Sequence, residues 1–107
     1  MRWTIEFADA AVLRELQAMP RDIVARFVRI SKLIEDFGLE SVHEPYVKHL
    51  EGRLWEMRMK GRDGIARAVY VTATGRRVVI VHVFAKKTQK TPRRELELAL
   101  KRAKDVK

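Results

Sequence analysis

The first third of the chain changes from an alternating pattern to a helical one. Residues 2–8 alternate apolar and polar positions, which predicts a half-buried strand. Apolar residues then recur every three or four positions over 10–19 and again over 20–37, which predicts two helices. Asp9 is expected to cap the first helix and Gly38 to end the second. The two helices are expected to form a hairpin.

The middle of the chain returns to short alternating or apolar runs. Residues 39–48 are predicted to form a loop, and Leu50–Lys60 a strand with one apolar and one charged face. Ile65–Thr74 is predicted to be a second strand, joined by a tight turn to a third over Arg77–Ala85. The third is apolar on both faces, so it is expected to lie in the centre of a sheet.

The last part of the chain predicts one more helix and, with it, the fold class. Thr91 is expected to cap this helix and Pro92 to stand in its first turn, before a helical stripe of apolar residues. The element order is then β-α-α-β-β-β-α. This order predicts an α+β fold with an N-terminal helical hairpin packed on a mostly antiparallel sheet. At 107 residues, a single domain over 1–107 is expected.

The charge of the chain is strongly positive and unevenly placed. The net charge is +9, with −2 over residues 1–45 and +11 over 46–107. This asymmetry indicates an acidic partner, either a nucleic acid or a protein. The chain has no cysteine, which excludes a disulfide framework, a zinc–thiolate site and a thiol nucleophile. No apolar run is longer than a strand, so we expect a cytoplasmic protein without a signal peptide or membrane contact.

The third predicted strand runs directly into a group of lysines. Lys86, Lys87 and Lys90 follow the apolar run within five residues. Arg58 and Arg67 lie on the two preceding strands. If these strands are neighbours, five cations converge on one face of the sheet, where a polyanion can bind. Arg67 interrupts an otherwise apolar strand, where an unpaired charge would be costly, so a specific role is expected for it.

Three segments carry a resemblance to a known family. They are LWEMRMK over 54–60, ARAVY over 66–70 and HVFAKKTQKTP over 82–92. Together with the element order, they resemble the RelE/ParE superfamily of type II toxins, and within it the phage-derived HigB-like branch. The resemblance implies a RelE-like fold and a ribosome-dependent endoribonuclease that cuts translated mRNA without metal or cofactor. It also implies a cognate antitoxin, often a HigA-like helix-turn-helix protein.

The resemblance also assigns candidate site residues. Those matched to the basic residues that line the toxin cleft are Arg58, Arg67, Lys86 and Lys87. Gln89, Lys90 and Thr91 belong to the same motif and are expected to contact RNA. Lys48 and Lys60 are further basic residues expected to contact RNA, although Lys60 also fits a solvated charge at a strand edge.

RNA cleavage by the internal 2′-hydroxyl requires a base, an acid and cations that stabilise the phosphorane. Arginine stays protonated, so Arg58 and Arg67 suit charge stabilisation. A lysine crowded by other cations has a lowered pKa, so Lys86 or Lys87 is expected to act as base or acid. The sequence does not decide between these two roles.

Other residues that could carry chemistry are interpreted as structural. Glu56 is expected to pair with Arg58 on the same strand face, and His82 to be a buried, hydrogen-bonded core histidine. His43 and His49 lack a third ligand at recognisable spacing, so no metal site is expected. Tyr46 is the aromatic residue best placed for stacking on a base.

Two other functions remain open from the sequence. One is a ParE-like toxin that inhibits DNA gyrase, a branch that shares the fold but lacks the catalytic cations. The other is a catalytically degenerate toxin homologue that only binds nucleic acid, with the salt dependence of such binding.

Overall fold

The computed structural model describes residues 2–43, 46–86 and 90–107. In these ranges the elements are β1 (Thr4–Phe7), α1 (Ala10–Gln17), α2 (Arg21–Phe37), the short 3-10 helix η1 (Leu39–Ser41), β2 (Val47–Glu51), β3 (Leu54–Lys60), β4 (Ile65–Ala73), β5 (Arg77–Lys86) and α3 (Arg93–Ala103). None of these helices is both long and apolar enough to cross a membrane.

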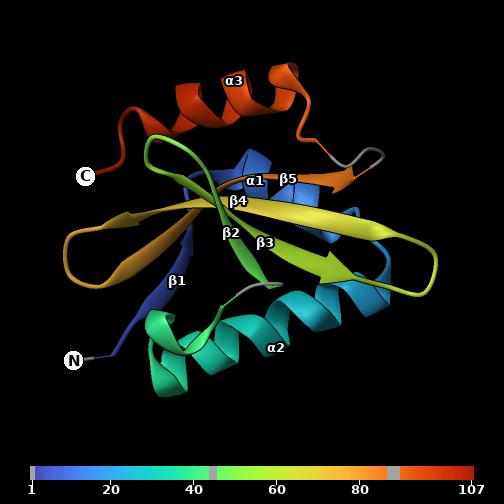
Figure 1. Cartoon of the computed structure of the whole chain (residues 1–107), viewed down its shortest axis with the longest axis horizontal. Coiled ribbons are helices and arrows are strands. Elements are labelled where there is room, and N and C mark those ends of the chain that lie inside the picture. The colour runs from blue at the N-terminus through green and yellow to red at the C-terminus, as the bar shows by residue number, and fades with distance from the viewer. Residues whose placement is uncertain (1, 44–45, 87–89) are drawn as a thin grey trace.

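The strands form one mixed sheet in the order β1-β5-β4-β3-β2 (Figure 1). β1 is parallel to β5, and every other neighbouring pair is antiparallel. β5 lies between β1 and β4, which confirms the central position predicted from its apolar character. The chain thus has an α+β fold, and the strands that carry the predicted cations are neighbours.

Helices cover both faces of this sheet (Figure 1). One face packs against α1 and α2 in a core that includes Phe27, Ile34 and Tyr70. The other packs against α3 through a smaller cluster that includes Leu54 and Val81. Because side chains alternate along a strand, each residue of β3 and β4 faces either α2 or α3. The charged residues that alternate along β3, which the sequence predicted to share one face of that strand, therefore lie on the α3 face of the sheet.

The edge strand β2 corrects the predicted element order. Residues 39–48 were expected to form a loop and Leu50–Lys60 one strand, but β2 and β3 form a hairpin around Gly52. Gly52 has a φ of 55°, which permits the tight turn. The register between β2 and β3 shifts between His49 and Glu51, so β2 lacks the strict alternation by which strands are recognised. The order β-α-α-β-β-β-α was therefore one strand short.

The predicted helix ends are confirmed in two cases and wrong in a third. The Asp9 carboxylate accepts a hydrogen bond from the backbone N–H of Val12 at 3.1 Å, as expected of an N-cap. Gly38 ends α2 with a φ of 93°. Thr91 does not cap α3, because Pro92 occupies the N-cap position and the Thr91 hydroxyl binds Arg67 instead.

Candidate functional site

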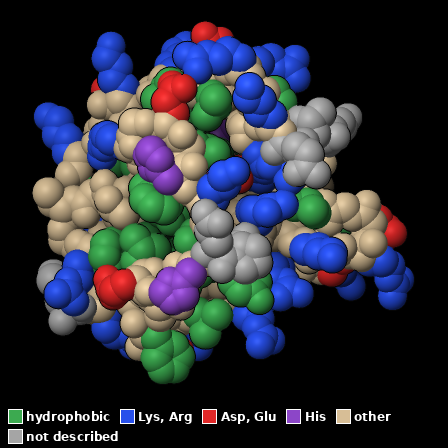
Figure 2. All heavy atoms as spheres, viewed as in Figure 1, with side chains coloured by type: hydrophobic (Ala, Val, Ile, Leu, Met, Phe, Trp, Pro, Cys, Tyr) green, Lys and Arg blue, Asp and Glu red, His purple; other side chains and the backbone are tan. Residues whose placement is uncertain are grey.

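Charged side chains of four neighbouring strands meet on the α3 face of the sheet. Arg58 and Arg67 stand directly opposite each other in the β3–β4 register, so their side chains share this face. Lys86 pairs with Ile65, two residues before Arg67, and Lys48 pairs with Glu56 on the other side. Figure 2 shows Lys and Arg side chains gathered near the centre of this view, between α3 and α2.

Arg67 is buried and held from two sides. Only 4% of it is exposed, and its guanidinium nitrogen Nη1 lies 3.1 Å from a carboxylate oxygen of Glu56, which is 1% exposed. The same nitrogen donates to the Thr91 hydroxyl at the entrance to α3. The expected pairing of Glu56 with Arg58 is therefore wrong. The diagonal partner on β4 lies within reach of a long side chain, and the pairing follows from strand register rather than from sequence spacing.

The environment changes the pKa of three groups in this cluster. Burial raises the pKa of Glu56, although Arg67 and Arg58 oppose the rise. Burial also lowers the pKa of Arg67, and its ion pair with Glu56 counteracts that effect. Partial burial lowers the pKa of Lys86, and the positive charges of Arg67 and Arg58 lower it further. Lys86 is therefore easier to deprotonate than an ordinary lysine.

Two depressions adjoin the Arg58–Arg67 pair. One, of about 500 Å³, lies under the start of α3, and among the described residues it is lined by Lys48, His49, Leu50, Glu51, Glu56, Arg67, Lys90, Thr91 and Leu96. The other, of about 430 Å³, is lined within the described part of the chain by Arg26, Tyr46, Arg58, Lys60 and Ile65. The predicted RNA contacts Lys48, Lys90 and Thr91 therefore gather around Arg67, and Lys60 lies beside Arg58.

Two of the predicted site residues, Lys87 and Gln89, lie outside the described residues. The other seven lie on the strands and the α3 entrance just described. Within residues 2–43, 46–86 and 90–107, no group of three His, Asp or Glu side chains is arranged to hold a metal ion.

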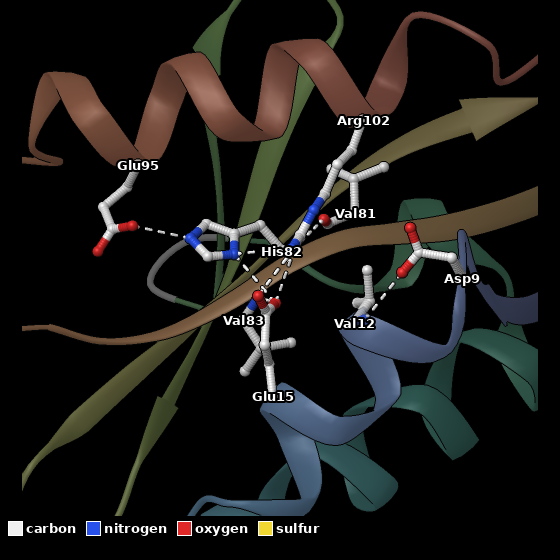
Figure 3. Close-up of polar contacts among 8 residues, drawn as sticks. All are labelled: Asp9, Val12, Glu15, Val81, His82, Val83, Glu95 and Arg102. Carbon is white, nitrogen blue, oxygen red and sulfur yellow. Dashed lines mark hydrogen bonds and ion pairs between the residues drawn. The ribbon is translucent and has the colours of Figure 1, made fainter.

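A second polar cluster, which the sequence did not predict, lies where β1 ends (Figure 3). His82 is buried, as predicted, and its ring nitrogens lie 3.0 Å from Glu15 of α1 and 2.8 Å from Glu95 of α3. Arg102 of α3 contacts both oxygens of Glu15, at 3.0 and 2.9 Å. These residues are far apart in the sequence. The sequence signal for the cluster was therefore only His82, a polar residue inside an apolar strand.

This cluster completes the edge of β5. β1 pairs with β5 only as far as Ile80, so the next residues of β5 have no strand of the described chain on that side. The Glu15 carboxylate accepts from the backbone N–H of Val83 at 2.9 Å, and Arg102 donates to the carbonyl of Val81 at 3.1 Å. Side chains thus satisfy the backbone groups that a longer β1 would have paired. The cluster also ties α1 and α3 to the strand that carries Lys86.

Comparison with known proteins places the chain in a family. Residues 14–104 match the family described as "Phage derived protein Gp49-like (DUF891)". The chain belongs to this Gp49-like family. No curated protein is significantly similar to it.

Among solved structures, this Gp49-like chain is similar to a chain of the archaeal RelE–RelB complex from Pyrococcus horikoshii OT3. The TM-score is 0.62 at 20% sequence identity, over 79% of this chain and 96% of the other. At this level of identity the match establishes a RelE-like fold.

Proposed function

We propose that this Gp49-like chain is the toxin of a toxin–antitoxin pair, of the HigB-like kind. In this proposal it is an endoribonuclease that cleaves mRNA during translation, on the ribosome, through attack by the 2′-hydroxyl of the substrate and without a metal ion. The RelE-like fold and the Gp49-like family support the class of protein. The charged face of the sheet supports the chemistry.

The observation that carries the proposal is the meeting of Arg58, Arg67 and Lys86 on one face of three adjacent strands. Cations fixed on a rigid sheet are already oriented toward a phosphate, so they stabilise the extra negative charge of the phosphorane without reorganising. Arg58 makes no ion pair with any described residue, so its guanidinium can donate two parallel N–H bonds to a phosphate. RNA is the substrate because only RNA carries the attacking 2′-hydroxyl.

Lys86 is proposed as the general base. Its pKa is lowered by partial burial and by Arg67 and Arg58, so a larger fraction of it is neutral at working pH than of an ordinary lysine. The neutral amine accepts the proton of the 2′-hydroxyl, and the oxygen then attacks the adjacent phosphorus. The 5′-oxygen of the next nucleotide departs and takes a proton. The sequence analysis also named Lys87 as a base or acid, and Lys87 is the candidate that donates this proton.

The proposed partner is an antitoxin with acidic residues. The similar crystal structure contains RelE together with RelB, and this chain carries a net charge of +9 that an acidic segment would neutralise. A HigA-like helix-turn-helix antitoxin is proposed on the same grounds as the HigB-like class. Co-expression with the neighbouring reading frame should relieve toxicity and yield a co-purified complex.

The cellular test compares translated and untranslated copies of one transcript. The chain is expressed from an inducible promoter, and cleavage is mapped on a reporter with an intact or a mutated start codon. Cuts are expected within the open reading frame of the translated copy alone. Growth arrest with intact transcripts would overturn the endonuclease proposal, and equal cleavage of both copies would overturn its dependence on the ribosome.

Purified components test the roles of individual residues. Arg58→Ala should lower the single-turnover rate on programmed ribosomes roughly a hundredfold or more, because one stabilising donor is lost. Lys86→Arg keeps the charge but cannot release a proton at working pH, so it should lose the rise in rate with pH that a general base gives. Lys104→Ala, on the exposed end of α3, is the matched control and should cleave normally. A normal pH profile for Lys86→Arg would remove Lys86 as the base.

A further inference from the structure

The depression beside Arg58 has the composition of a nucleotide subsite. Its described lining combines three cations, Arg26, Arg58 and Lys60, with the aromatic ring of Tyr46 and the apolar Ile65. None of these five residues is acidic, and none of the three cations makes an ion pair with a described residue. A volume of about 430 Å³ lies within the range of pockets that hold small ligands.

The strand register explains how these residues come together. β2 begins at Val47, and the N–H of Arg58 donates to the carbonyl of Tyr46, the residue before β2, at 2.8 Å. Within the described residues β3 has no strand partner beyond this point, and Arg26 of α2, the helix on the other face of the sheet, lines the depression there. Tyr46 is 49% exposed, which leaves its ring available for contact.

We propose that this depression binds a nucleotide of single-stranded RNA next to the scissile phosphate, with its base stacked on Tyr46 and its phosphate held by Arg26 and Lys60. The inference rests on the proposed function for the identity of the strand. Arg58 lines this depression and stands opposite Arg67, which lines the other one, so a strand passing over this pair enters both. Stacking on an aromatic ring tolerates any base, so the subsite binds RNA without reading its sequence.

The test measures binding without cleavage. The probe is a fluorescein-labelled tetranucleotide in which every ribose is 2′-O-methylated, so that no 2′-hydroxyl can attack. Tyr46→Ala should weaken binding roughly 5- to 100-fold, and Tyr46→Phe should bind like the parent because the ring is kept. Phe37→Ala removes another exposed ring, at the end of α2, and should have no effect.

Salt dependence separates the phosphate contact from the stacking contact. Each phosphate neutralised on a single strand contributes about −0.7 to the slope of log K against log salt. Arg26→Gln should reduce the slope by about this amount, whereas Tyr46→Ala should leave the slope unchanged. Arg29→Gln is the matched control, since Arg29 lies on the same helix and lines a neighbouring surface together with Arg26, but does not line the depression. An equal change for Arg29→Gln would mean that net charge alone acts, and would overturn the subsite.

The stacked base is located with abasic probes. In each probe one base of the tetranucleotide is removed. At the position that stacks on the ring, this removal should weaken binding to the parent but not to Tyr46→Ala. If removal of the base at every position weakens binding to the parent and to Tyr46→Ala equally, Tyr46 does not contact a base and the proposal is wrong. Tyr46→Ala that binds the probe normally but loses a co-expressed antitoxin would assign the depression to a protein partner and also overturn it.

The outcomes separate this inference from the proposed function. A parent chain that cleaves mRNA on ribosomes, with binding and cleavage unchanged in Tyr46→Ala, would remove the subsite and leave the endonuclease intact. A parent chain that binds the probe through Tyr46 and Arg26 but cleaves no transcript would confirm the subsite and remove the endonuclease. A parent chain that does not bind the probe at all would overturn the subsite.

Discussion

Replacing Arg67 by methionine should destabilise the protein far more than the same change at Arg58. Arg67→Met leaves the Glu56 carboxylate, 1% exposed, without the guanidinium 3.1 Å away. Breaking a buried pair by removing one partner costs about 3–5 kcal/mol. This loss is a large part of the free energy of unfolding of a typical domain, which is on the order of 5–15 kcal/mol. Arg58→Met removes a half-buried cation without an ion pair to a described residue and should cost about 0.5 kcal/mol or less.

The pH dependence of this loss has a definite sign. Burial already raises the pKa of Glu56, and the loss of Arg67 removes the largest opposing charge, so the pKa rises further. A carboxyl whose folded-state pKa lies above its unfolded value of about 4.3 stabilises the fold when protonated. Stability is therefore gained as the pH falls through the folded pKa toward the unfolded one. The deficit of Arg67→Met relative to the parent should be larger at about pH 8 than at about pH 5.

Urea unfolding followed by tryptophan fluorescence measures these effects through Trp3 and Trp55. The double variant Glu56→Met/Arg67→Met removes both charges and should recover most of the lost free energy, because an apolar pair of similar size replaces a buried ion pair at little cost. It also keeps the test informative if Arg67→Met alone does not fold. A loss for Arg67→Met no larger than for Arg58→Met, or the same deficit at both pH values, would refute the reasoning.

Three other changes test separate parts of the fold. Glu15→Ala removes the acceptor of the Val83 backbone amide and the carboxylate partner of Arg102, and should cost about 1.5–3 kcal/mol in urea unfolding, whereas the exposed Glu97→Ala should be neutral. Gly38→Ala places a side chain at a φ of 93° and ψ of 156° and should cost about 1–3 kcal/mol, whereas Gly64→Ala meets open space. Burial raises the pKa of Tyr70 to about 12, so stability should fall as the pH rises above about 10, less steeply in Tyr70→Phe; an equal fall in both would exclude this cause.

The sequence was sufficient for the parts of the site that depend on local pattern. Arg58, Arg67 and Lys86 were expected to converge on one face if their strands were neighbours, and the register of β3, β4 and β5 places them so. Tyr70 lies three residues after Arg67, so alternation places the two side chains on opposite faces, and Tyr70 lies in the core formed with α1 and α2. Alternation within a strand is a local rule, so one sequence is enough to apply it.

The parts that were missed depend on how separate segments align. The partner of Glu56 is set by the register of β3 against β4, which the sequence does not show. β2 was missed because a register shift breaks its alternation and Gly52 hides a turn inside what looked like one strand. The cluster around His82 exists because β1 ends early, and that length is fixed only once the sheet has formed.

The two arginines of the pair therefore have different physical states, although the sequence presents them alike. One nitrogen of Arg67 already contacts both Glu56 and Thr91, so Arg67 fixes the position of β3 relative to the entrance of α3 before any substrate arrives. Arg58 and Lys86 make no ion pair with a described residue, so they can bind a phosphate without first breaking such a pair. Since Arg67 also lowers the pKa of Lys86, its proposed contribution to catalysis acts through that lysine and through the rigidity of the sheet as well as through its own charge.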